Sequence, residues 1–104
     1  MRDKTLIKRT LRRLGDLLSG DHGLTVDVDT NQIDAWDASD EPSTGATLIV
    51  DYDPALDEWH VSVTQGRKYY GVGPFGPDTS VWTLYREAMG AARRESDLLP
   101  EITR

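Results

Sequence analysis

A glycine-rich stretch in the second half of the chain combines cations with aromatic rings. It runs from Gly66 to Gly76 and includes Arg67, Lys68, Tyr69, Tyr70 and Phe75. Cations beside rings can hold a phosphate backbone and stack on a base, and tyrosine and arginine are also enriched at the centres of protein–protein interfaces. The stretch therefore indicates a binding surface. A structural role is the alternative, in which one tyrosine and Phe75 pack under the last helix while the glycines turn the chain.

Carboxylates dominate a second stretch, residues 16–58, which has twelve acidic residues and no lysine or arginine. Such a concentration of negative charge predicts an acidic face that binds the basic surface of another protein, including one that handles nucleic acid. The candidate residues of this face are Asp27, Asp29, Asp34, Asp37, Asp40, Glu41, Asp51 and Asp53. Trp36 lies in the same stretch, and we expect it, with Tyr70 and Trp82, to supply exposed aromatic contacts.

Residues 1–15 have the opposite charge, with six basic residues and one acidic residue. The candidates for a basic helix face are Lys8, Arg9, Arg12 and Arg13. Such a face can bind phosphates with a strong dependence on salt. The alternative is a solvated face that neutralises part of the acidic stretch. The formal net charge of −6 is therefore the sum of a basic segment, residues 1–15, a strongly acidic segment, residues 16–58, and a nearly neutral remainder.

Few residues support other kinds of chemistry. The chain has no cysteine, which excludes disulfides, thiolate catalysis and zinc–thiolate sites. His22 and His60 are too few for a zinc site. Asp27–Asn31 resembles the start of a calcium loop, but Gln32 replaces the glycine that such a loop requires. Because no nucleophile elbow or phosphate-binding glycine loop is present either, we expect no enzyme activity and no cofactor.

Length and composition bound the remaining possibilities. A chain of 104 residues with 38% hydrophobic residues fits one domain with a modest core. No apolar run approaches the roughly 18 residues of a membrane-spanning helix, and no leader segment is recognisable, so we expect a cytoplasmic protein. Arginine outnumbers lysine nine to three, which suggests a GC-rich genome such as that of an actinobacterium or a phage that infects one.

Hydrophobic periodicity predicts the elements that must position these residues. We expect helices over residues 4–19 and 79–95, strands over residues 24–28, 32–36, 46–52, 58–64 and 68–72, and a short tail over residues 96–104. Asp3 is the expected N-cap of the first helix and Gly20 its end, and Asp78 or Thr79 is the expected N-cap of the last helix.

This order of elements predicts a two-layer α+β domain. An antiparallel meander of three to five strands lies between the two helices in sequence, and both helices should cover one face of the sheet. The other face should then display His60, Ser62 and Thr64. Ile7, Leu11, Leu14 and Leu18 form a short apolar seam on the first helix, which faces either the core of a monomer or the other protomer of a homodimer.

These observations favour a small non-catalytic accessory or regulatory module that binds a partner protein through its acidic face and exposed aromatic residues. The alternative is a nucleic-acid-binding module that uses the basic first helix and the Arg67–Lys68 hairpin. That alternative requires both basic segments to face the same way, because only then do they form one phosphate-binding surface.

Overall fold

The structure is a computed structural model that describes residues 4–39 and 45–96. Asp3, Asp40, Glu41 and the expected tail after Ser96 lie outside these residues. The elements are α1 (Lys4–His22), β1 (Thr25–Val28), β2 (Gln32–Trp36), β3 (Ala46–Asp53), β4 (Glu58–Gln65), β5 (Lys68–Phe75) and α2 (Val81–Glu95).

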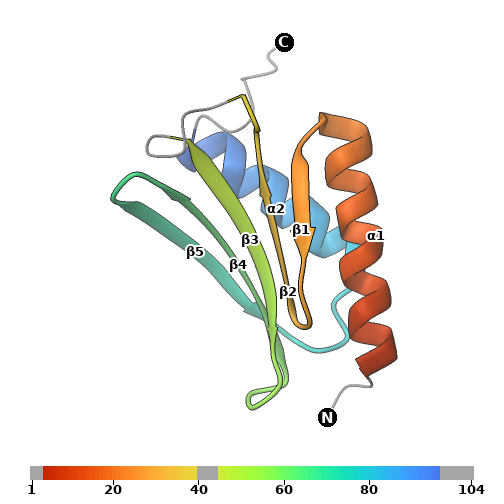
Figure 1. The fold of residues 1–104 in the computed structure, drawn as a ribbon. Helices are drawn as coiled ribbons and strands as arrows, with labels where there is room; N and C mark the ends of the chain where they lie inside the picture. The colour runs from red at the N-terminus through yellow and green to blue at the C-terminus, as the bar shows by residue number, and fades with distance from the viewer. Residues whose placement is uncertain (1–3, 40–44, 97–104) are drawn as a thin grey trace.

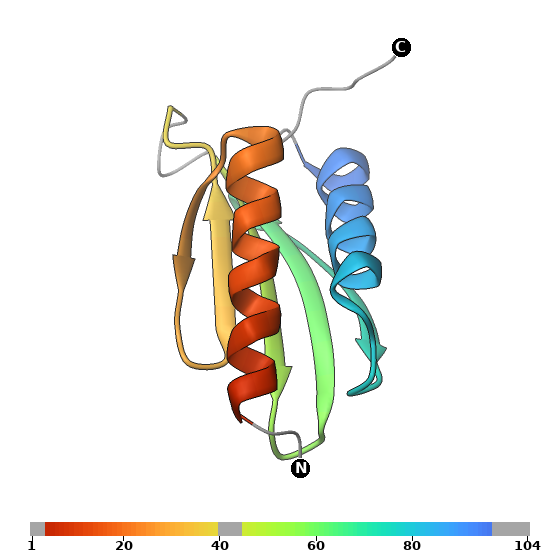
Figure 2. The ribbon, with the colours of Figure 1, turned by 90° about the vertical axis from the view of Figure 1, so that its right-hand side faces the viewer.

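The five strands form one antiparallel sheet in the order β1-β2-β3-β4-β5. Both helices pack on the same face of this sheet, where they lie side by side (Figures 1 and 2). Helix α1 contacts β1 and β2, and α2 contacts β3, β4 and β5. The predicted two-layer α+β fold is therefore confirmed, and neither α1 nor α2 lies over the opposite face of the sheet.

The core lies between the helices and the sheet. The α1 seam of Ile7, Leu11, Leu14 and Leu18 is buried in it, so these residues face their own sheet. Gly15 allows α1 to lie close to the strands, since a Cβ atom there would lie 3.2 Å from the Cδ1 atom of Ile33. Helix α2 contributes Leu84, Ala88, Met89 and Ala92. No helix in the described part of the chain is long and apolar enough to cross a membrane.

The ends of both helices differ from the sequence-based predictions. Helix α1 continues past Gly20 to His22 and ends at Gly23, whose φ of 67° is the left-handed conformation that favours glycine. Gly23 N–H donates to the Ser19 carbonyl at 2.9 Å, which closes the last turn. Helix α2 is capped by neither Asp78 nor Thr79, because Ser80 Oγ accepts the Thr83 N–H at 3.1 Å and fills this role.

Strand β5 extends beyond the predicted end at residue 72. Pairing with β4 resumes at Phe75 opposite Trp59 after an irregular step in the register. A cis peptide bond between Gly73 and Pro74 lies in this segment. Val72 and Phe75 both pack against the core, which holds the strand on the sheet on either side of the irregularity.

Candidate functional site

The face of the sheet that neither α1 nor α2 covers carries the alternate side chains of all five strands. Burial alternates along β3, where Leu48, Val50 and Tyr52 face the core. We call the opposite set the outer sheet face: Thr25, Asp27, Gln32, Asp34, Trp36, Thr47, Ile49, Asp51, Asp53, Glu58, His60, Ser62, Thr64, Tyr69 and Gly71.

The strand register gathers carboxylates at one end of this face. Asp27 lies directly opposite Asp34, and Asp53 lies directly opposite Glu58. Like charges directly opposite each other on neighbouring strands are destabilising. Asp34 Oδ1 accepts a hydrogen bond from Gln32 Nε2 at 2.8 Å, which fixes its carboxylate within this group. The sheet therefore contains two pairs of carboxylates that repel each other. Packing of the core does not explain them, because they lie on the face away from the core.

Asp51 lies at the centre of the carboxylate group, between Gln32 on β2 and His60 on β4. Partial burial raises the pKa of its carboxyl group. The charge of His60 opposes this shift, and the negative charges of Asp53 and Asp34 add to it. His60 in turn pairs with Glu58, whose Oε2 lies 3.0 Å from its Nε2 atom. A partner that brings positive charge to this position would relieve the repulsion.

A polar and aromatic row crosses the other end of the outer sheet face. Trp36 pairs with Thr47, Thr47 with Thr64, and Thr64 with Tyr69. Tyr69 is 71% exposed. Its hydroxyl lies 3.0 Å from the position that a Cβ atom on Gly71 would occupy, so the ring lies over that glycine. The face thus combines carboxylates at one end with two exposed or half-buried aromatic rings at the other.

Tyr70 is 36% exposed, and the strand register places the two neighbouring tyrosines on opposite faces of the sheet. Tyr69 is on the outer sheet face, whereas Tyr70 pairs with Val63 and so points to the side of the sheet that carries the helices. The sequence contains a signal for this placement. If Gln65 pairs with Lys68 across the turn, Thr64 pairs with Tyr69, and both side chains then lie on the same face of the sheet. Phe75 is half-buried and packs against the core, as in the structural alternative for this stretch.

Burial departs from the expectation at one of the three β4 residues that we expected this face to display, namely His60, Ser62 and Thr64. His60 and Thr64 are half-buried, but Ser62 is only 8% exposed. Ser62 lies directly opposite Gly71. The predicted display of Ser62 is therefore wrong.

Asp29 and Asp37 lie outside the strands, and Asp29 lines a cavity with Lys8 and Arg12 of α1. Asp29 lies in the turn between β1 and β2 and accepts the Thr30 N–H at 2.8 Å. Asp37 follows β2, where hydrogen bonds from the side chain and the backbone of Ser39 lower the pKa of its carboxyl group. Asp40 and Glu41 lie outside the described residues. Asp27, Asp34, Asp51 and Asp53 are the candidates that the register brings together.

The basic candidates lie in the other layer. Lys8, Arg9, Arg12 and Arg13 are all exposed on α1. Helices α1 and α2 together hold eight basic and four acidic residues, whereas the five strands hold five acidic residues and one lysine. The formal charge is therefore +4 in the helical layer and −4 in the strands. The helical layer and the strands thus carry net charges of opposite sign.

Metal binding finds no support in the described part of the chain, which contains no group of three or more histidine, aspartate or glutamate residues placed to hold an ion.

Replacing Asp51 with asparagine should stabilise the protein. The folded state raises the pKa of this carboxyl group, so its ionised form is disfavoured by folding, and stability decreases as the pH rises through the folded-state pKa. Asp51→Asn removes that charge without changing the shape of the side chain. The thermal midpoint should rise at pH 7 and be unchanged at about pH 2, well below the reference aspartate pKa of about 3.9. Asp16→Asn, on α1, is the control, and an equal rise in that variant would contradict the explanation.

The junction of the helices should respond to pH in the opposite sense. His22 Nε2 lies 2.7 Å from the hydroxyl oxygen of Tyr85 on α2. Burial lowers the pKa of His22, Asp21 opposes this shift, and Arg93 adds to it. Since the folded-state pKa is below the unfolded value of about 6.5, stability from neutral His22 is present above that pH and is lost as the pH falls through the folded-state pKa.

The thermal midpoint should therefore decrease between pH 7 and pH 5 more in the wild-type protein than in His22→Gln. Differential scanning calorimetry of the two proteins side by side measures this difference. The Glu58–His60 pair is present in both proteins and cancels in the comparison. Parallel midpoint curves for the two proteins would show that His22 does not titrate as inferred.

Comparison of the chain with protein-family models, with curated proteins and with solved structures finds no match.

Proposed function

We propose that this protein is a small non-catalytic accessory or regulatory module that binds a basic partner protein through its outer sheet face. The single observation that supports this function most strongly is the strand register. It gathers Asp27, Asp34, Asp51, Asp53 and Glu58 on a face that neither helix covers. Electrostatic repulsion among these residues costs stability in the free protein, and a cationic partner would remove that cost.

The aromatic row supports the same proposal. Interfaces are enriched in tyrosine and tryptophan at their centres, and surrounding polar contacts exclude water. Trp36 and Tyr69 would bury apolar area against the partner, while the carboxylates attract its basic residues and fix its orientation. A partner whose basic surface handles nucleic acid fits this chemistry, because such a surface already accepts an array of negative charges.

The nucleic-acid-binding alternative, as a single surface made of the first helix and the Arg67–Lys68 hairpin, has less support. The basic residues of α1 lie in its N-terminal half, and the turn between β4 and β5 lies at the opposite end of the fold (Figure 1). The two segments therefore do not face one ligand together.

Affinity capture from a cell lysate, with and without nuclease, tests the proposed function. The bait proteins are the wild type, the sheet variant Asp27→Asn/Asp34→Asn and the control variant Asp16→Asn/Glu87→Gln, which loses two carboxylates from the helices. We expect a basic protein that survives nuclease treatment, that is depleted with the sheet variant and that is retained with the control. Loss of the captured protein after nuclease treatment, or equal capture by all three baits, would contradict the proposal.

A further inference from the structure

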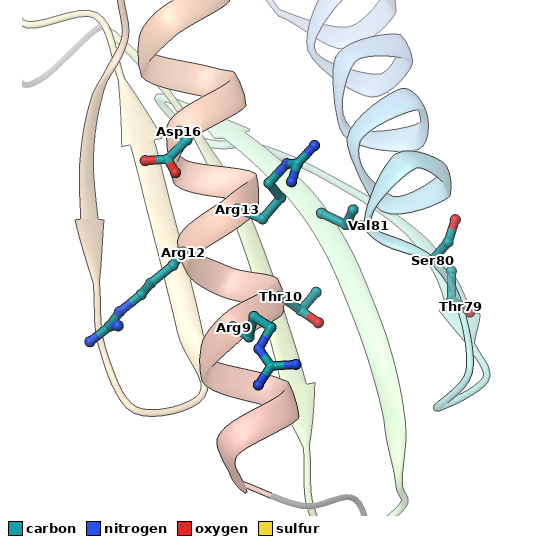
Figure 3. A pocket seen from close by; sticks show the side chains of 8 residues that line it. All are labelled: Arg9, Thr10, Arg12, Arg13, Asp16, Thr79, Ser80 and Val81. Atoms are coloured by element: carbon teal, nitrogen blue, oxygen red, sulfur yellow. The ribbon is translucent and has the colours of Figure 1, made fainter.

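Helices α1 and α2 form a groove on the face opposite the outer sheet face. Two cavities open along it, one of about 450 Å³ between Arg9 and Arg13 of α1 and Val81 of α2, and one of about 320 Å³ between His22 of α1 and Trp82 and Arg86 of α2. In the first cavity Arg9 and Arg13 extend on the side of α1 that faces α2, whereas Arg12 points away from α2 (Figure 3). We call this region the helix groove.

Trp82 is the exposed ring of the helix groove, with 54% of its surface accessible. The Arg13 guanidinium lies over this ring, 5.8 Å from its centroid. Tyr85 meets the same ring edge-on at 6.2 Å between centroids, and the Tyr85 hydroxyl is held by His22 at 2.7 Å and by Asp21 at 3.3 Å. Contacts from both helices therefore hold a large aromatic surface in place although it is open to solvent.

The positive charge of the helix groove is available to a ligand. Among the described residues, Arg9, Arg13, Arg86 and Arg93 form no salt bridge with a carboxylate. Two carboxylates lie near them, since Asp16 lines the first cavity and Asp21 contacts Tyr85. The acidic residues of the outer sheet face are on the other side of the sheet, so the local charge of the groove is positive although the chain has a net charge of −6.

We propose that the helix groove binds single-stranded nucleic acid, with Trp82 stacking on a base and the arginines on either side contacting the adjacent phosphates. The guanidinium group matches a phosphate with two parallel hydrogen bonds, and every base presents a flat face to an aromatic ring. A single strand satisfies both requirements because its bases are accessible, whereas a duplex hides their faces. An acidic peptide satisfies the charge of the groove, but its carboxylates are not each accompanied by an aromatic ring, as the phosphates of a nucleic acid are.

Fluorescence anisotropy of a labelled oligothymidine of about ten nucleotides, a length within the usual site size, tests this proposal at low salt. We expect Trp82→Leu to weaken binding roughly tenfold, because stacking on one aromatic residue contributes an effect of this size. Arg9→Ala/Arg13→Ala should weaken binding and flatten its salt dependence, by about 0.7 in the logarithmic slope for each phosphate that is no longer neutralised. Arg67→Ala/Lys68→Ala is the matched control at the distant hairpin and should leave the affinity unchanged.

Circular dichroism melting curves establish that each variant is folded before binding is measured. The absence of binding by the folded wild-type protein at low salt would overturn the proposal. Binding that is insensitive to Trp82→Leu, or a duplex of the same sequence that binds as tightly, would overturn the stacking contact. A polyglutamate peptide that binds as tightly and responds to the same variants would assign the groove to an acidic protein instead.

Discussion

Replacing Trp59 with alanine should lower the free energy of unfolding by about 3–5 kcal/mol, the usual cost of removing a large aromatic side chain from a core. The Trp59 side chain is 2% exposed and meets the Tyr52 ring edge-on at 5.3 Å. On its other side Trp59 pairs with Phe75, where β5 rejoins the sheet. Because a domain of this size has a total stability of about 5–15 kcal/mol, urea denaturation should show a much lower midpoint.

Trp59→Phe is the matched control for this prediction. It retains a ring against Tyr52 and removes the indole N–H, which is buried and has no hydrogen-bond partner among the described residues. Its loss of stability should therefore be well below that of Trp59→Ala, since an unpaired buried donor contributes nothing favourable. A loss under about 1 kcal/mol for Trp59→Ala would contradict the placement of this residue in the core.

The double variant Trp36→Ala/Tyr69→Ala should weaken binding of the basic partner protein by about 30-fold or more, the loss typical of aromatic residues at the centre of an interface. Trp36 and Tyr69 lie in one row across the outer sheet face, with Thr47 and Thr64 between them. Tyr69 contributes little to the core because it is 71% exposed. Calorimetric titration with the partner identified by capture measures the change in affinity.

Trp82→Ala provides the control for this binding prediction. Trp82 is also an exposed tryptophan, but it lies in the helix groove on the opposite layer. Its replacement should leave the affinity for the basic protein unchanged. If Trp82→Ala weakened the protein complex as much as Trp36→Ala/Tyr69→Ala did, the outer sheet face would not be the binding surface.

Periodicity was sufficient to predict most of the fold. The spacing of Ile7, Leu11, Leu14 and Leu18 identified the buried side of α1, and alternation along β4 assigned His60, Ser62 and Thr64 to the face opposite the helices. Helix ends were harder to predict, because Asp78, Thr79 and Ser80 are three consecutive residues of types that can cap a helix. The continuation of β5 past Gly73 depends on contacts between Phe75 and the core. Strand propensities of the local sequence do not predict such contacts.

The residues of the candidate site could not be grouped from the sequence alone, because their grouping depends on how the strands pair and on which side of the sheet the helices pack. The charge blocks predicted acidic and basic surfaces, but the placement of these surfaces in different layers follows from the strand register and from both helices packing on one side of the sheet. The same register selects Tyr69 rather than Tyr70 for the outer sheet face. The helix groove joins Arg9 and Arg13 to Arg86 and Trp82, and no spacing rule connects residues so far apart in the chain.

Site-specific photocrosslinking tests most directly the central claim, that the outer sheet face binds a basic protein. A benzophenone amino acid is introduced in place of Thr47, in the middle of the aromatic row, and in a second protein in place of Arg12 on the helical layer. We predict a crosslink to a basic protein from position 47 that persists after nuclease treatment, and no crosslink to that protein from position 12. A crosslink to that protein from position 12 alone, or equally from both positions, would contradict the account.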